Sequence, residues 1–190
     1  MTATEIESEI DSQRFRAVLG HFCTGVTVVS ADDGEHLAGL ACQSFAALSL
    51  DPPLVLFCPT KTSGSWQVIE RAGRFAVNVL AADQDDVSTV FGSRGTDKFA
   101  SVDWRYSPGG SPLIDGVLTW IDCKLEATHE AGDHYVVVGR VQSLGETRDT
   151  RPLLFYQGSY SVTERTEDEP APIRNDLEGL LTWPRPDDWF

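Results

Sequence analysis

The feature that most constrains this fold is the shortness of the connections between its apolar, β-branched segments. The segments at residues 117–128 and 134–144 are joined by the single turn HEAGDH, and two earlier runs are joined by Asp-Asp-Gly. Parallel strands need a crossover of about a dozen residues or more, so strands joined this closely pair antiparallel. About seven such segments, with helical segments inserted, predict a mainly β fold, either a barrel or an α+β arrangement.

Three segments carry helical signals. Phe15, Val18, Leu19 and Phe22 recur at the spacing of one helix face, behind a cap at Asp11 or Ser12. The segment SGSWQVIERAG predicts a second helix that ends at Gly73 in the left-handed conformation. A third helix is expected in AADQDDVSTVF. Residues 92–116 cluster Gly and Pro and predict a long surface excursion, and PLLFYQGSYSV predicts a last strand.

The composition divides the chain near residue 164. Residues 1–163 are expected to form one domain, whereas residues 164–190 form an acidic tail with four prolines. The tail ends in apolar side chains that a disordered segment has little use for. These are Leu177, Leu180, Leu181, Trp183, Trp189 and Phe190. We therefore expect a short docked helix in NDLEGLL, against the body or a neighbouring subunit.

The net charge of -14 excludes two classes of partner. Such a chain repels phosphate backbones and anionic lipid, so neither nucleic acid nor a membrane surface is expected as a partner. No apolar run has membrane-spanning length, and the acidic N-terminus is unlike a signal peptide. The four cysteines are widely spaced without a CxxC pair, which predicts reduced thiols in a cytoplasmic protein.

Several familiar catalytic motifs are absent. The chain contains no G-x-G-x-x-G, no G-x-x-x-x-G-K-[ST] and no G-x-S-x-G. The glycine-rich stretch GSRG at residues 92–95 is too short a signal to carry an assignment. His129 and His134 are five residues apart across a probable turn, so no zinc site and no other metal is expected.

The segment GLACQSFAALSLDPPLVLFCPT combines core-like apolarity with many small polar residues. Gly39 and Ala41 allow close approach to a flat ligand, while CPTKTSGSW places hydroxyls and free backbone N–H groups where a helix begins. A helix start carries partial positive charge and unsatisfied donors, so it predicts an anion site. His134 lies beside an acid at the start of a strand.

The order of five motifs resembles the flavin reductase family. They are TGVTVV, SFAALSLDPPLV, FAVNVL, FGS followed by DKF, and GDH followed by VGRV, and together they cover residues 15–160. The resemblance implies an antiparallel split β-barrel that binds FMN. Members are reductase components of two-component flavin-dependent monooxygenases. GHFCTGVTVV and RPLLFYQGSY are most similar to reductase partners of actinobacterial steroid-ring monooxygenases, which implies steroid or aromatic catabolism.

The resemblance also implies a site. The polar groups of the segment GLACQSFAALSLDPPLVLFCPT would make their hydrogen bonds to the flavin, FMN or FAD, instead of to the protein. The expected contacts of the flavin ring are Gly39, Leu40, Ala41, Gln43 and Ser44, with Leu37 and Ala38 completing that strand. The ribityl and phosphate end is expected at Cys58, Pro59, Thr60, Gly64 and Ser65. Val90 and Phe91 are expected to cover part of the flavin, and Lys98 to reach a phosphate.

His134 is the catalytic candidate that the resemblance implies. It is expected to position NADH by a hydrogen bond, with Tyr160 as an aromatic neighbour, because the hydride transfer itself belongs to the two nucleotides. No arginine cluster for a 2′-phosphate is evident, which favours NADH over NADPH.

The implied activity is NADH-dependent reduction of free FMN or FAD for a separate oxygenase, by a homodimer. Three alternatives stay open: a non-catalytic flavin-binding barrel, an oxidase of the pyridoxamine-phosphate type, and a lipocalin-like carrier. The oxidase would want a basic cluster, where this chain has scattered arginines. The carrier would leave the hydroxyl cluster at the helix start unexplained.

Overall fold

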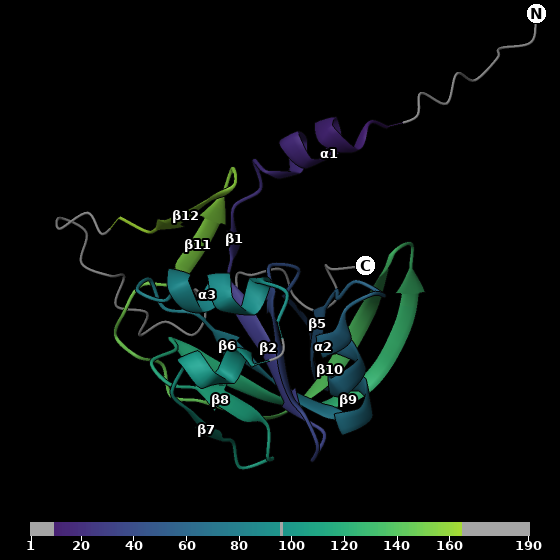
Figure 1. Ribbon diagram of the computed structural model, residues 1–190, viewed down its shortest axis with the longest axis vertical. Coiled ribbons are helices and arrows are strands. Elements are labelled where there is room, and N and C mark those ends of the chain that lie inside the picture. Colours follow the sequence, from purple (N-terminus) through teal and green to yellow (C-terminus); the bar gives the residue numbers. More distant parts are fainter. Residues whose placement is uncertain (1–9, 96, 165–190) are drawn as a thin grey trace, which may run out of the picture.

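The structure, a computed structural model, describes residues 10–95 and 97–164 (Figure 1). The short helix expected in residues 175–181 therefore lies outside the described residues. In the described part, no helix is both long and apolar enough to cross a membrane.

Seven antiparallel strands form the main sheet, in the order β3-β2-β6-β9-β10-β5-β4. The pairing of β9 with β10 runs from Ala131 and His134 at the turn to Ile121 and Leu144. The short connections therefore predicted the pairing correctly. The bounds of the seven strands are β2 (Thr27–Asp32), β3 (Leu37–Cys42), β4 (Ala46–Leu50), β5 (Pro53–Phe57), β6 (Arg74–Val79), β9 (Thr119–Ala131) and β10 (His134–Leu144).

Two helices pack against β3, which is the end strand of this order. In α2 (Gly64–Ala72), Trp66 and Ile69 are buried in a cluster with Phe57 and Phe75, and Gly73 ends the helix at φ 64° as predicted. The helix α3 (Asp85–Gly92) contributes Phe91 to a second cluster. Both helices thus meet β3, which lies between them.

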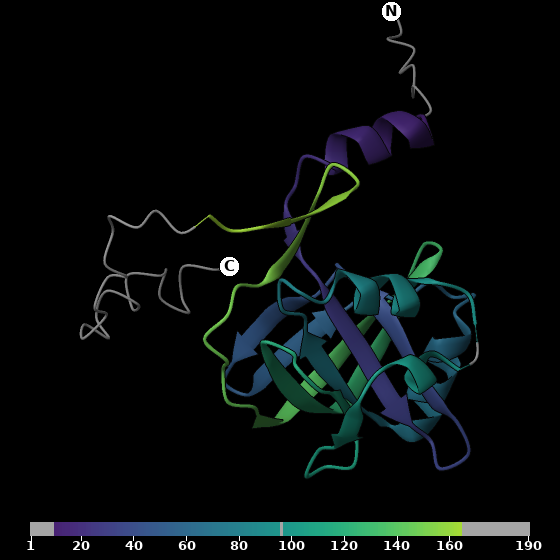
Figure 2. The same cartoon turned by 60° about the vertical axis from the view of Figure 1, so that its left-hand side comes forward.

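The predicted last strand is wrong in one respect, because it is a hairpin. β11 (Leu153–Tyr156) and β12 (Ser159–Val162) turn at Gln157 and Gly158, both with positive φ. The hairpin joins β1 (Thr24–Gly25) in a small sheet. The predicted first helix is α1 (Ser12–Leu19), capped by the Asp11 side chain. Figures 1 and 2 show α1 and the hairpin projecting from the barrel.

The predicted surface excursion at residues 92–116 is also only partly right. It contains a 3-10 turn, η1 (Lys98–Ser101), and a hairpin of β7 (Trp104–Tyr106) and β8 (Pro112–Ile114), whose second strand is buried. The buried Asp122 accepts hydrogen bonds from the hydroxyls of Ser107 (2.6 Å) and Ser111 (2.8 Å). Asn78 Oδ1 accepts from Ile114 N at 2.8 Å. These bonds hold the hairpin of β7 and β8 against the barrel.

Candidate functional site

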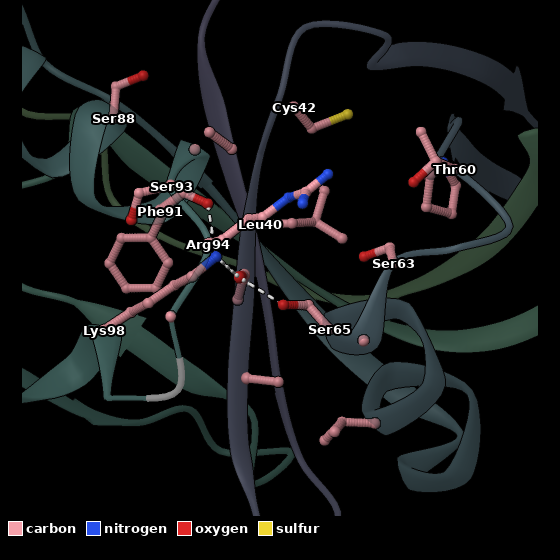
Figure 3. Close-up of a pocket in the computed structure, with 18 of the residues that line it drawn as sticks. Leu40, Cys42, Thr60, Ser63, Ser65, Ser88, Phe91, Ser93, Arg94 and Lys98 are labelled. Atoms are coloured by element: carbon pink, nitrogen blue, oxygen red, sulfur yellow. Dashed lines mark hydrogen bonds between the residues drawn. The ribbon is translucent and has the colours of Figure 1, made fainter.

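A groove of about 1160 Å³ runs along β3 between α2 and α3 (Figure 3). Its floor is β3 itself, from Leu37 to Cys42. We call one side the α2 wall, made by Thr60, Ser63, Gly64 and Ser65. We call the other side the α3 wall, made by Phe91, Ser93, Arg94 and Lys98.

The α2 wall is the start of a helix. The Ser63 side chain caps it by accepting from Trp66 N at 3.2 Å, and the Ser65 hydroxyl donates to Gly39 O at 2.9 Å. The first backbone N–H groups of a helix lack intrahelical acceptors and lie at the positive end of its dipole. The helix start that the sequence predicted is therefore present. That it binds an anion stays a prediction.

The α3 wall carries two cations. Lys98 Nζ donates to Phe91 O at 2.8 Å and to Gly39 O at 3.2 Å, so it ties the end of α3 to β3. Partial burial lowers the pKa of Lys98. Arg94 reaches across the groove toward Leu40 (Figure 3), and it makes no ion pair within the described part of the chain.

Gly39 is the point where the two walls meet. Its carbonyl oxygen accepts from both Ser65 and Lys98. A Cβ at this position would lie 2.5 Å from Cε1 of the buried Phe91 ring. A side chain at residue 39 would therefore push the α3 wall away from β3.

One end of the groove, which we call the His134 end, is lined by Gln43, Ser44, Cys58, Pro59 and His134. The Ser44 hydroxyl accepts from Cys58 N at 3.0 Å and donates to Cys58 O at 3.2 Å. The interpretation that this hydroxyl needs a ligand is therefore wrong, because the backbone already satisfies it. Burial raises the pKa of the neighbouring Cys42 thiol.

His134 is placed at the groove by the chain around it. His134 and Thr60 form an isolated antiparallel β-bridge, and the backbone N–H of the next residue, Tyr135, donates to Pro59 O at 2.9 Å. The His134 Nδ1 lies 2.7 Å from Asp133 Oδ1, which lowers the pKa of Asp133. A hydrogen bond at Nδ1 leaves Nε2 for another partner.

No carboxylate lines the groove within the described residues, although the chain has a net charge of -14. Its basic side chains are Arg94 and Lys98, and two histidines, His36 and His134, also line it. The charge of the groove lining is therefore opposite in sign to the net charge of the chain.

Most of the predicted site residues line this one groove. They are Leu37, Ala38, Gly39, Leu40, Ala41, Gln43, Ser44, Cys58, Pro59, Thr60, Gly64, Ser65, Phe91, Lys98 and His134. Two predicted residues are not part of its lining. Val90 packs against the apolar cluster around Phe91. The Tyr160 hydroxyl donates at 2.9 Å to Oγ of Ser88, which itself lines the groove. That Tyr160 is an aromatic neighbour of the bound nucleotide at His134 stays a prediction.

Sequence reasoning missed several lining residues. The main ones are His36, Cys42, Ser63, Val68, Ser93 and Arg94. Arg94 stands in the GSRG stretch, whose motif was too short to use. The sequence does hold one signal for Arg94: it is a basic residue in a glycine-rich loop directly after a predicted helix, a position from which it can reach a ligand.

Comparisons with known proteins identify relatives of this chain. A family model described as "Flavin reductase like domain" matches residues 19–164. The reductase subunit HsaB of a flavin-dependent monooxygenase from Rhodococcus jostii is 58% identical over 181 residues, which are 95% of this chain and 93% of that protein. The FMN reductase (NADH) SmoA of Agrobacterium fabrum is 43% identical, over 82% of this chain and 88% of its own.

A solved structure shows the same fold. The crystal structure of a nitrilotriacetate monooxygenase component B homologue from Mycobacterium thermoresistibile aligns with a TM-score of 0.80 and 56% identity. The alignment covers 90% of this chain and 96% of that one. The predicted antiparallel split barrel and the oxidoreductase class are confirmed. The chain belongs to the flavin reductase family.

Proposed function

We propose that this chain reduces free FMN or FAD with NADH and releases the reduced flavin to a separate monooxygenase. The observation that carries the proposal is the carboxylate-free groove, with a helix start on one side and Arg94 and Lys98 on the other. A flavin phosphate needs such an anion site. The relatives named FMN reductase (NADH) and monooxygenase reductase subunit support the activity.

The chain's own residues would bind and orient the flavin. The α2 wall donates backbone N–H groups to the phosphate, and Arg94 adds a charged donor from the α3 wall. Gly39 and Ala41 let the ring lie close to β3, with the ring directed to the His134 end. When bound, the flavin accepts a hydride from the nicotinamide, and the protein supplies proximity and orientation.

We assign His134 to positioning NADH. Its Nδ1 is engaged by Asp133, so Nε2 is the ring nitrogen available to hydrogen-bond the nicotinamide nucleotide. His134→Ala is expected to raise the KM for NADH about tenfold while FMN affinity stays within twofold. Steady-state kinetics at varied NADH measures this. An unchanged KM and turnover would leave His134 without the role.

The partner and pathway belong to the same proposal. Reduced flavin has to leave, and the groove is open along β3, so modest flavin affinity is expected. The similarity of GHFCTGVTVV and RPLLFYQGSY to reductases of steroid-ring monooxygenases supports a place in steroid catabolism. The four cysteines are all free, which is consistent with a cytoplasmic protein.

We further propose that the chain is a homodimer. No residue of α1 is buried, and its Phe15, Val18 and Leu19 expose half or more of their surface, as does the following Phe22. An exposed apolar helix face of this kind marks an interaction surface. A second copy is expected to cover it, and light scattering of wild type against Val18→Asp tests this. A monomeric wild-type protein would contradict the dimer.

The activity itself is tested by an NADH-consumption assay. Wild-type protein is supplied in turn with FMN, FAD and riboflavin, with NADH or NADPH as donor. We expect consumption of NADH with FMN or FAD. Flavin binding without consumption of either nicotinamide nucleotide would favour the non-catalytic flavin-binding barrel.

A further inference from the structure

The turn before His134 lies beyond the part of β10 that pairs with β5. β9 and β10 are joined there by Gly132 and Asp133, and both of these residues are exposed. The pairing of β10 with β5 begins only at Val137, so it does not reach the turn. An exposed turn has few buried contacts to fix it. The position of His134 therefore depends on what else holds the turn.

The segment that follows β5 holds the turn through its backbone. Lys61 N donates to Asp133 O at 2.9 Å, and the neighbouring Thr60 forms the β-bridge with His134. Residue 61 is thus hydrogen-bonded to the residue directly before His134. This bond does not involve the Lys61 side chain, so it persists when that side chain is changed.

The Lys61 side chain makes a second connection to the same turn. Its Nζ donates to Glu130 Oε2 at 2.7 Å and lies 5.5 Å from the centre of the Tyr135 ring. The bond raises the pKa of Lys61 and lowers the pKa of Glu130, so both groups are charged at neutral pH. The Tyr135 ring in turn packs against Trp66 of α2, with 5.7 Å between the ring centroids. Lys61 therefore contacts both strands of the hairpin, one on each side of the turn.

We propose that Lys61, through its ion pair with Glu130, is a positioning residue for His134, an assignment that rests on the proposed role of His134 in binding NADH. Its side chain contacts the strand that ends before the turn and the strand that begins after it, and His134 is the first residue of the second strand. Lys61 does not line the groove, whereas Thr60 and Thr62 on either side of it do. Its ammonium acts on the turn and not on a ligand in the groove.

The expected effect is modest, because the pair is exposed. The Lys61 and Glu130 side chains are 31% and 77% exposed, and exposed ion pairs contribute little. Loss of the pair is expected to raise the KM for NADH about threefold, which is less than the rise expected for His134→Ala. FMN affinity should stay within twofold, because the turn is at one end of the groove and the pair is outside it.

Steady-state kinetics of the full chain with FMN and varied NADH, together with fluorescence titration of FMN, test the proposal. Lys61→Met and Glu130→Gln should each raise the KM for NADH by the same factor, and the double variant should raise it no further, because either change removes the same pair. Lys61→Arg should restore the wild-type KM, since a guanidinium also bonds a carboxylate.

The matched control is an ion pair on the same two strands, away from the turn. Arg140 Nε and Nη2 donate to the Glu126 carboxylate at 2.9 and 2.6 Å, and both side chains are partly exposed. Arg140→Met removes this pair and should leave the KM for NADH unchanged. A rise equal to that of Lys61→Met would assign the effect to the hairpin as a whole and would contradict the proposal.

The decisive comparison is made in the His134→Ala background. Lys61→Met should have no further effect there, because the residue that it positions is gone. A threefold rise in that background, or opposite effects of Lys61→Met and Glu130→Gln, would show that the ammonium acts on NADH directly and would overturn the proposal. An unchanged KM in both single variants, while His134→Ala raises it, would overturn the role of Lys61 and leave the proposed function standing. An unchanged KM in His134→Ala would remove both roles.

Discussion

The two walls of the groove offer an anion different chemistry. The α2 wall presents neutral donors that a capped helix fixes in place, with Ser63 at its start and Gly73 at its end. The α3 wall presents Arg94 and Lys98 on the loop and turn that follow α3. Hydrogen-bond donors of fixed direction therefore come from the α2 side of β3, and positive charge comes from the α3 side. The walls meet at one atom, the carbonyl oxygen of Gly39.

The largest effect is expected where the walls meet. Gly39→Ala places a Cβ 2.5 Å from the Phe91 ring, which should lower the free energy of unfolding by about 1–3 kcal/mol. Flavin affinity should fall with it, because the α3 wall is displaced. Urea unfolding and flavin titration measure the two effects. Gly25→Ala is the control, since nothing lies within 4 Å of its Cβ, and equal behaviour of the two variants would contradict the account.

Lys98→Met should come next in size and should weaken FMN and riboflavin alike. Both recorded bonds of its ammonium go to the groove itself, to Phe91 O and Gly39 O, so its removal loosens the wall for any flavin. We expect roughly a tenfold loss for each ligand in fluorescence titrations. A loss confined to FMN would instead make Lys98 a direct phosphate ligand.

Arg94→Met should change the affinities for FMN and riboflavin differently. The guanidinium crosses the groove without an ion-pair partner in the described part, so it is available to a phosphate. FMN affinity is expected to fall about fivefold and riboflavin affinity to stay unchanged. Arg14→Met on α1 is the matched control. Equal titration curves for FMN in wild type and Arg94→Met would remove Arg94 from the site.

The smallest effect concerns the ion pair behind the α2 wall. Arg71 lowers the pKa of Asp33 to about 2, below its usual value near 4. A lowered carboxyl pKa gives stability that is present above pH 4 and is lost as the pH falls toward 2. Asp33→Asn should therefore be less stable than wild type at pH 7, with a smaller gap at pH 3, in urea unfolding. A gap that widens at pH 3 would contradict the assigned pair.

Local sequence patterns predicted the α2 wall and the strand pairing. The cap-and-glycine pattern around SGSWQVIERAG marks a helix start, and the turn HEAGDH forces an antiparallel pair, since both signals lie within a few residues. Local patterns did not indicate which residues share one site; the resemblance to the family supplied that list. Fifteen of its seventeen predicted residues line the groove. Val90 on α3 packs into the cluster around Phe91 instead, and Tyr160 on β12 bonds the lining residue Ser88.

The α3 wall depends on contacts between distant segments. Arg94 joins the site because α3 packs against β3, and Lys98 ties the end of α3 to Gly39, which is 59 positions away in the chain. No local pattern encodes that placement. Ser44 bonds Cys58 across fourteen positions in the chain, so its hydroxyl was assigned to a ligand when only the sequence was considered. Such residues become visible only with the tertiary structure.

A crystal structure of this chain with FMN tests the central claim most directly. The account predicts the phosphate between the start of α2 and Arg94, level with Gly39, and the ring directed along β3 to the His134 end. A flavin bound elsewhere, or in this groove with its phosphate beside His134, would contradict it.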